Sequence, residues 1–229
     1  MADLGYASTN LEGYRATLLD STGNFVASST GAYTCNDGIS FANAFTNQDG
    51  TVYQQRSGTG VFCVNRVGPT VATGAVVTIS LCRWQYALMY LLMGGKLVED
   101  GSGDIIGWSM PDPDELVDRR ICLEAWTLAV DGEVQAEVGG QPAYHHHIWP
   151  QATFALSDFT LADAVNVFGV IATVSPNPAV GNGPYNDWPD FDEPLGLLDG
   201  HPTGPWASFL DTAPPSFLCQ TANFVVPAS

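Results

Sequence analysis

The chain alternates short apolar runs with glycine- and proline-rich breaks, a pattern typical of β-strands separated by turns. Its 229 residues include 24 Gly and 15 Pro. In residues 31–67, Ser, Thr, Phe, Tyr and Val alternate between three turn signals, which predicts two or three hairpin strands. This part has few acids and could extend away from the core.

One segment, residues 84–93, predicts a helix. It is rich in good helix formers and is followed by two glycines, a typical C-terminal stop. Because it is apolar almost all round, it must be covered on more than one side, either by its own chain alone or also by a neighbouring subunit. Tyr86, Tyr90 and Met93 share one side of this helix, and we expect that side to lie at a subunit boundary.

The remaining pattern predicts further strands. Val77, Ile79 and Leu81 alternate with more polar residues in segment 76–82, as in a half-buried strand. Residues 96–108 predict a hairpin with an acidic tip that contains Asp100 and Asp104. Three more strands are expected at residues 119–130, 143–156 and 164–174, the last apolar on both faces and therefore central.

No repeat or low-complexity linker interrupts the chain, so we expect one mainly β domain, a barrel or sandwich with one flanking helix and extended hairpins. Residues 1–74 would supply N-terminal strands and an arm, 75–174 the core, and 175–229 C-terminal loops and an arm. Segment 175–215 is rich in Pro, Gly, Asp and Trp and is expected to pack as an ordered loop.

The strongly negative net charge disfavours several classes of function. The chain has seven Lys and Arg against 24 Asp and Glu, a formal net charge of −17, which disfavours a nucleic-acid-binding protein because such a protein needs a basic face. Arg120 is the last basic residue, and the 109 residues after it hold 12 acids. These acids cannot be neutralised within that half, and phosphate ligands and anionic membranes are disfavoured.

The cysteine pattern and the N-terminal residues predict the cellular compartment of the protein. The five cysteines are widely spaced without a C-x-x-C pair, so we expect neither a disulfide framework nor a zinc knuckle, but small apolar core residues in a reducing compartment. Residues 1–9 lack the basic and apolar regions of a leader, and no apolar run approaches the roughly 18 residues of a membrane span. The expectation is a soluble protein made in the cytoplasm.

Candidate chemistry is weak. In a strand, His145 and His147 would share one face and His146 the other, which could begin a metal site but lacks further ligands. Segment 112–115 offers paired carboxylates, but Pro-spaced acids beside a turn are typical of a solvated loop. The acids at 187, 190, 192 and 193 could wrap a hard cation, although they lack calcium-loop spacing and a solvated loop is favoured. No nucleophile, zinc-hydrolase or dinucleotide motif is present. We therefore expect no enzyme, metal or cofactor.

The chain has more aromatic and aliphatic residues than one core requires, and few long charged side chains, which is typical of buried subunit interfaces. Alternatively, all these residues could be buried within a single β core. Trp149 and Trp188 are further candidates for a subunit interface.

Several short features occur in an order that resembles the major tail proteins, or tail tube proteins, of long non-contractile-tailed bacteriophages, especially those of actinobacteria. The resemblance covers about residues 75–219. Its pieces are Leu81-Cys82, Met93-Gly94-Gly95, Leu97-Val98, Ile105-Ile106-Gly107, Glu124-Ala125-Trp126-Thr127, Trp149-Pro150, Asp158-Phe159-Thr160-Leu161, Gly181-Asn182-Gly183-Pro184-Tyr185, Pro194-Leu195 and Ala213-Pro214-Pro215. Departures are the three histidines and Val180, where an aromatic residue is more familiar.

The resemblance implies a virion protein, made in the host cytoplasm, that forms homo-hexameric rings. The rings stack into a tube through which genomic DNA leaves without specific binding, and other tail proteins join both ends. An acidic wall suits such a conduit because it repels phosphates. Candidates for lumen acids are Asp100, Asp104 and Glu124.

Two other classes stay open. One is a different virion component: a distal tail, tail completion or head decoration protein. The other is a carbohydrate-binding β-sandwich that would use exposed aromatic residues and acids near residues 185–193.

Overall fold

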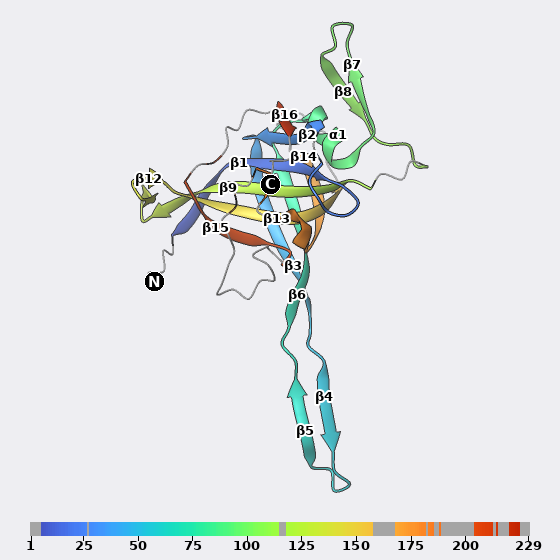
Figure 1. Ribbon diagram of the computed structural model, residues 1–229, viewed down its shortest axis with the longest axis vertical. Helices are drawn as coiled ribbons and strands as arrows, with labels where there is room; N and C mark the ends of the chain where they lie inside the picture. The colour runs from blue at the N-terminus through green and yellow to red at the C-terminus, as the bar shows by residue number, and fades with distance from the viewer. Residues whose placement is uncertain are drawn as a thin grey trace, which may run out of the picture.

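The protein is built on one large antiparallel sheet (Figure 1). The computed structural model describes residues 6–26, 28–114, 118–157, 168–181, 183–185, 188, 204–212, 214 and 220–224. Its main strands are β1 (Ala7–Leu19), β2 (Ser28–Cys35), β3 (Gly38–Gln48), β6 (Val71–Leu81), β9 (Arg120–Asp131), β13 (Tyr144–Leu156), β14 (Phe168–Ser175) and β16 (Gln220–Phe224). They pair in the order β16-β2-β1-β9-β13-β14-β6-β3, with β10 (Val134–Gln135) on β9 and β15 (Ala207–Asp211) on β13.

Six short strands form three separate hairpins. They are β4 (Val52–Arg56) with β5 (Phe62–Val67), β7 (Lys96–Glu99) with β8 (Ile105–Ser109), and β11 (Glu137–Val138) with β12 (Gln141–Pro142). A 3₁₀ turn, η1 (Pro178–Val180), follows β14. Within the described residues, the mainly β architecture with one α-helix is as expected.

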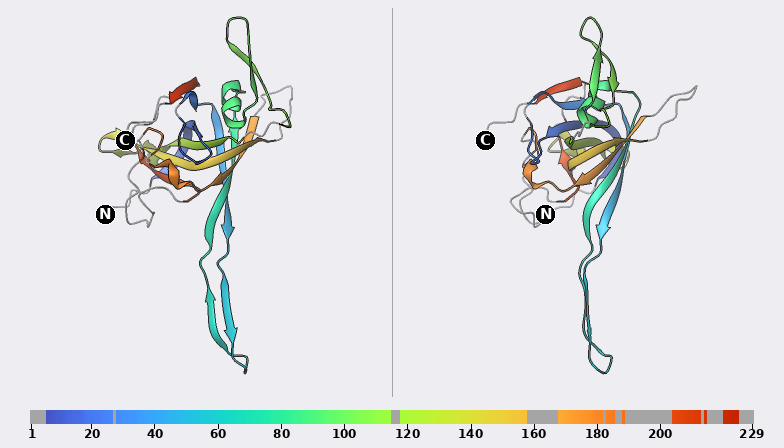
Figure 2. Two further views of the ribbon diagram at one scale, coloured as in Figure 1. Left: turned by 45° about the vertical axis from the view of Figure 1, so that its right-hand side comes forward. Right: turned by 90° about the vertical axis from the view of Figure 1, so that its right-hand side faces the viewer.

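The sheet curls around a core on its concave side (Figure 2). On β6, Val77, Ile79 and Leu81 are buried in this core, while the residues between them are half-buried or exposed, which confirms the predicted alternation. Side chains of β1 and β3 also pack together, Tyr14 against Phe41. Among the described strands no pairing joins the two ends of the sheet, so it is consistent with a sandwich and does not close as a barrel.

Strand β14 lies inside the sheet, between β13 and β6, as its apolar sequence predicted. Its two faces differ, however. Val170, Ala172 and Val174 are buried, whereas Ile171 is 36% exposed on the other face. The expected start of this strand, residues 164–167, lies outside the described residues.

The predicted helix is α1 (Tyr86–Met93). It packs on the core through Leu88, Met89, Leu91 and Leu92, and it ends at Gly94, whose φ of 74° is in the range that favours glycine. The helix begins two residues later than expected. Gln85 donates a hydrogen bond to Asp37 (3.1 Å) and so anchors the start of α1 to the turn between β2 and β3.

Two hairpins leave the body at opposite ends (Figure 1). Strands β3 and β6 continue past the sheet into β4 and β5, so the expected extension away from the core is confirmed for the second half of segment 31–67. The first half does not extend, because β2 is buried in the core and β3 pairs within the main sheet. At the base of this extension Gly50 and Gly68 lie so close that a Cβ at Gly50 would collide with the Gly68 backbone. The β7–β8 hairpin, expected at residues 96–108, projects from the other end.

The cysteine expectation is wrong in part. Cys35 is disulfide-bonded. Cys63 and Cys82 are free but exposed, and Cys122 is free and buried. Among the described cysteines, only Cys122 therefore matches the expected free core thiol, because β5 carries Cys63 away from the core and Cys82 follows the end of β6 at the surface. Cys219 lies outside the described residues.

Candidate functional site

Strand β13 divides the three histidines between two faces of the sheet, as its period-2 geometry predicted. His146 is fully buried on one face, with Glu124 of β9 as its hydrogen-bond partner. His147 lies on the other face beside Thr127. Two distinct sites result, a buried ionic cluster and an aromatic pocket.

The ionic cluster is centred on Glu124. Arg15 of β1 lies directly opposite it in the ladder and forms a bidentate ion pair, Nε to Oε2 at 2.6 Å and Nη2 to Oε1 at 2.7 Å. Glu124 Oε1 also accepts hydrogen bonds from His146 Nε2 (3.0 Å) and Trp188 Nε1 (2.8 Å). Both charged residues are 2% exposed or less. The cluster therefore joins β1, β9 and β13 to Trp188, which is far along the chain.

Aromatic rings enclose the cluster. The Arg15 guanidinium carbon lies 4.4 Å from the centre of the Tyr185 ring and 5.3 Å from that of Trp126. Trp126 stacks on His146 at 4.0 Å and donates a hydrogen bond to Asp211 (2.9 Å). Such enclosure excludes water and strengthens the ion pair.

The electrostatics favour a permanently ionised Glu124. Burial by itself would raise the pKa of this carboxyl, but the Arg15 charge and the hydrogen bonds from His146 and Arg15 lower it to about 2. The charges compensate each other and are closed to solvent, so the cluster is suited to holding strands in register. It offers no group to a substrate.

Three of the predicted site residues are thus placed differently. Glu124 cannot face a lumen because its own chain buries it, and Arg15 from the first third of the chain neutralises it. Trp188 is 4% exposed inside the same cluster. Trp149 is 3% exposed and stacks on Phe41. The expectation that these two tryptophans lie at a subunit surface is wrong.

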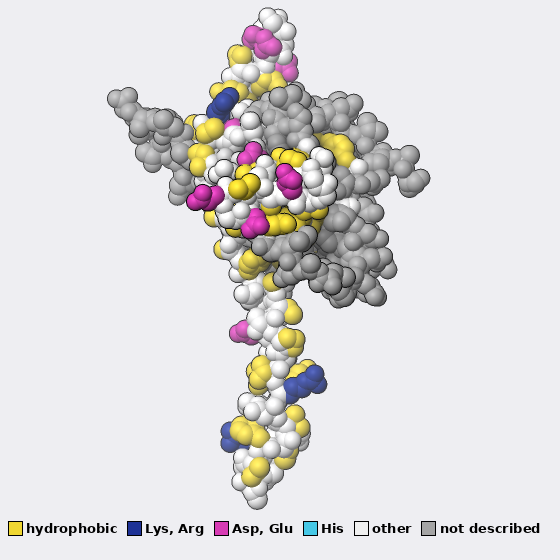
Figure 3. All heavy atoms as spheres, turned by 90° about the vertical axis from the view of Figure 1, so that its left-hand side faces the viewer, with side chains coloured by type: hydrophobic (Ala, Val, Ile, Leu, Met, Phe, Trp, Pro, Cys, Tyr) yellow, Lys and Arg dark blue, Asp and Glu magenta, His cyan; other side chains and the backbone are white. Residues whose placement is uncertain are grey.

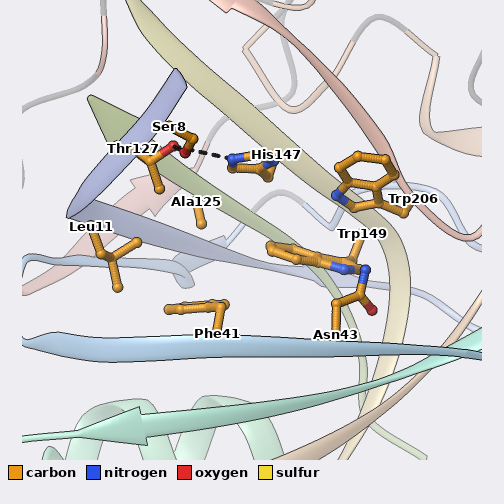
Figure 4. Close-up of a pocket in the computed structure, with 9 residues that line it drawn as sticks. All are labelled: Ser8, Leu11, Phe41, Asn43, Ala125, Thr127, His147, Trp149 and Trp206. Atoms are coloured by element: carbon orange, nitrogen blue, oxygen red, sulfur yellow. Dashed lines mark hydrogen bonds between the residues drawn. The ribbon is translucent and has the colours of Figure 1, made fainter. Parts of the chain in front are cut away.

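The aromatic pocket has a volume of about 270 Å³ and opens on the concave side of the sheet (Figure 4). Two stacked pairs, Phe41 with Trp149 (5.7 Å) and His147 with Trp206 (6.0 Å), form its walls. Its remaining lining residues are Ser8, Leu11, Asn43, Ala125 and Thr127.

Polar groups of the pocket are short and uncharged. The hydroxyls of Ser8 and Thr127 are hydrogen-bonded (2.6 Å), and Thr127 also bonds His147 Nε2 (3.2 Å). Burial, with the neighbouring His145 and His146, lowers the pKa of His147 to about 4, so this ring is neutral at pH 7. The pocket suits a neutral ligand about the size of one ring.

The remaining candidates stay apart from both sites. Tyr86, Tyr90 and Met93 are half-buried along one side of α1. Asp100 and Asp104 are exposed at the tip of the β7–β8 hairpin. The backbone N–H groups of Asp104 and Ser102 hydrogen-bond Asp100 and lower the pKa of its carboxyl.

Metal and catalytic candidates find no support in the described part of the chain, where no group of three or more His, Cys, Asp or Glu residues is placed to hold an ion. His145 Nε2 is hydrogen-bonded to the Tyr6 carbonyl (3.1 Å) rather than to a second ligand. Asp112 pairs with Lys96 on the surface. Glu115 and the acids at 187, 190, 192 and 193 lie outside the described residues.

Comparison with known proteins adds no assignment: no protein-family model matches the chain, and no curated protein matches it. The helix that the structure describes is too short to cross a membrane.

Sequence reasoning missed the Arg15–Glu124 pair, although a signal was present. Each residue is the lone charge within an apolar strand segment, YRATLL in β1 and ICLEAWTLAV in β9. One isolated charge of each sign in two buried strands favours a pair that compensates both. The aromatic pocket gave no such signal, because its walls come from β3, β13 and the residue before β15.

Proposed function

We propose that this protein is a structural subunit that assembles with copies of itself into stacked rings, the tail tube of a long-tailed bacteriophage. One observation carries the proposal: residues 50–70, here called the arm, have no core of their own. Every residue of β4 and β5 is exposed, including Tyr53 at 62% and Val67 at 64%. An isolated two-stranded hairpin is marginally stable in water, so a partner must cover this one.

The charge supports a conduit. The net charge of −17 remains after the Arg15–Glu124 pair cancels itself, so the excess acid is carried by other residues. A wall of this sign repels phosphates and leaves DNA solvated, whereas a basic wall would release counterions and bind. Six copies per ring, junctions with other tail proteins at both ends, and location in the virion belong to the same proposal.

The test removes the arm. Gln48 and Val71 are the last paired residues before it, so an Asn-Gly turn can replace residues 49–70. We expect purified wild-type protein to form tubes in negative-stain micrographs, and the shortened chain to stay folded by circular dichroism but remain dispersed. Tubes from the shortened chain would refute the role of the arm. A wild-type protein that stays monomeric at high concentration, even with a tail-tip initiator, would refute the assembly.

A second function is favoured by the aromatic pocket. Aromatic walls that include an imidazole and stand beside hydroxyl groups are suited to the apolar faces and hydroxyls of one sugar ring. In that case the monomer should bind a monosaccharide saturably by isothermal titration calorimetry, and Trp206→Ala should abolish the binding. Absence of binding heat across a panel of neutral hexoses and hexosamines would exclude this candidate.

The alternative virion roles are tested by the assembly experiment. The formation of tubes by the purified chain would exclude a head decoration or tail completion role.

A further inference from the structure

The arm differs in charge from the rest of the protein. Residues 50–70 contain Arg56 and Arg66 and no acid, so a segment of charge +2 projects from a chain of net charge −17. Neither arginine forms an ion pair with a residue that the structure describes. Figure 3 shows these basic side chains isolated on the arm, with apolar side chains around them.

Both arginines of the arm lie beside aromatic residues. Tyr53 lies opposite Arg66 in the ladder, whereas Arg56 lies opposite Phe62, with its guanidinium carbon 4.0 Å from the ring centre. Phe62 is still 42% exposed. A partner for the arm must therefore supply both carboxylates and apolar surface.

The β7–β8 hairpin has the complementary composition. Glu99, Asp100 and Asp104 are exposed around its tip. Ile105 and Ile106, just beyond the tip, are 41% and 56% exposed. Its own cation, Lys96, lies at the base and pairs with Asp112. The tip thus presents three carboxylates beside bare apolar side chains.

The two hairpins point in opposite directions along the longest axis of the molecule (Figures 1 and 3). They cannot meet within one chain. When copies are arranged head to tail, however, the arm of one copy reaches the β7–β8 hairpin of the next. A contact between two different surfaces is heterologous and can repeat without limit, as a stack of rings requires.

We propose that the arm of one copy docks on the β7–β8 hairpin of the next copy along the stack, with Arg56 and Arg66 facing Glu99, Asp100 and Asp104. This inference rests on the proposed assembly and names its longitudinal contact. Apolar burial supplies most of the affinity, while the charges set register and reject the reversed orientation, in which like hairpins would meet. It assigns the tip acids to subunit contact instead of the lumen.

Charge reversal on separate chains tests the contact. The first variant is Arg56→Glu/Arg66→Glu, and the second is Glu99→Lys/Asp104→Lys, which leaves the turn formed by Asp100 intact. Alone, each variant opposes like charges at every longitudinal contact, and we expect its critical concentration for tube formation to rise at least about tenfold. Mixed in equal amounts, the two should co-assemble, because each arm then finds a hairpin of opposite sign. A chain that carries all four changes should assemble alone.

The matched control is Glu133→Lys/Glu137→Lys, which changes the net charge as much as the second variant does. These two acids are exposed near the β11–β12 hairpin, at the side of the body. The control should assemble alone and should not rescue the arm variant. Rescue by the control, or normal assembly of both reversed variants, would overturn the docking while leaving the assembly intact. Failure of the wild type to assemble would instead refute the proposed function.

Discussion

Replacement of Glu124 by Gln should destabilise the subunit strongly, because it leaves a buried cation without its counter-charge. The Arg15 guanidinium, 2% exposed, would keep its charge but lose the carboxylate charge and the hydrogen bond from Nε to Oε2. Breaking a buried pair on one side costs about 3–5 kcal/mol. We expect a loss of this size in the free energy of unfolding of Glu124→Gln.

A second change should recover part of that loss. Glu124 Oε1 accepts hydrogen bonds from His146, Trp188 and Arg15 Nη2, and Oε2 accepts one from Arg15 Nε. A Gln can keep its oxygen at the Oε1 position, so His146, Trp188 and Arg15 Nη2 keep an acceptor, whereas its NH₂ group would face Arg15 Nε. The double variant Arg15→Met/Glu124→Gln also removes the unpaired charge. Its free energy of unfolding should exceed that of the single variant by about 2 kcal/mol or more, because a buried pair is often replaceable by apolar groups.

The pH dependence of the free energy of unfolding provides an independent check on the role of Glu124. With its pKa lowered from 4.5 to about 2, Glu124 contributes stability that is fully present above pH 4.5 and is lost as the pH falls toward 2. The difference corresponds to about 3 kcal/mol, and Glu124→Gln should lack this component.

Urea unfolding of the dispersed subunit, followed by circular dichroism at a series of pH values, measures all three quantities. Cys35 is kept in its disulfide throughout. The reasoning is refuted if Glu124→Gln costs less than about 1 kcal/mol at pH 7, the size of an ordinary surface change, or if the double variant is less stable than the single one.

Three further predictions concern other elements. The pKa of His147 is lowered from 6.5 to about 4 in the folded protein, so on acidification the unfolded chain takes up this proton at a higher pH than the folded one. The free energy of unfolding should therefore decrease as the pH falls from 6.5 to 4, and His147→Gln should remove this decrease. Tyr90→Glu, on the half-buried side of α1, should give a folded, soluble subunit that does not form tubes, and loss of the circular dichroism spectrum would show that the helix is simply core. Calorimetric titration of the assembled protein with zinc, nickel and copper should show no tight stoichiometric site, whereas a site lost in His145→Ala would contradict this.

The sequence predicted most of the strands and the helix because their signals are local. Alternation at Val77, Ile79 and Leu81 requires only that one face be buried, and the two glycines after Met93 end a helix in any context. The turn residues of 31–67 likewise predicted the hairpins, but the low acid content of this segment did not show that only its second half leaves the core. The face assignment of the three histidines followed from the two-residue period of a strand.

What the pattern could not supply is which distant residues meet. Arg15 and Glu124 are 109 positions apart, and they pair because β1 and β9 align in one register. The same registers bury Trp149 and place Trp188 against Glu124, where composition alone suggested exposed interface residues. Period and turn chemistry are properties of neighbouring residues, so the sequence by itself determined the elements and their buried faces. Strand register and pairing depend on contacts between residues that are far apart in the sequence. Only the tertiary structure therefore decided that Glu124 is a buried structural charge and that the arm is left without a partner within the described chain.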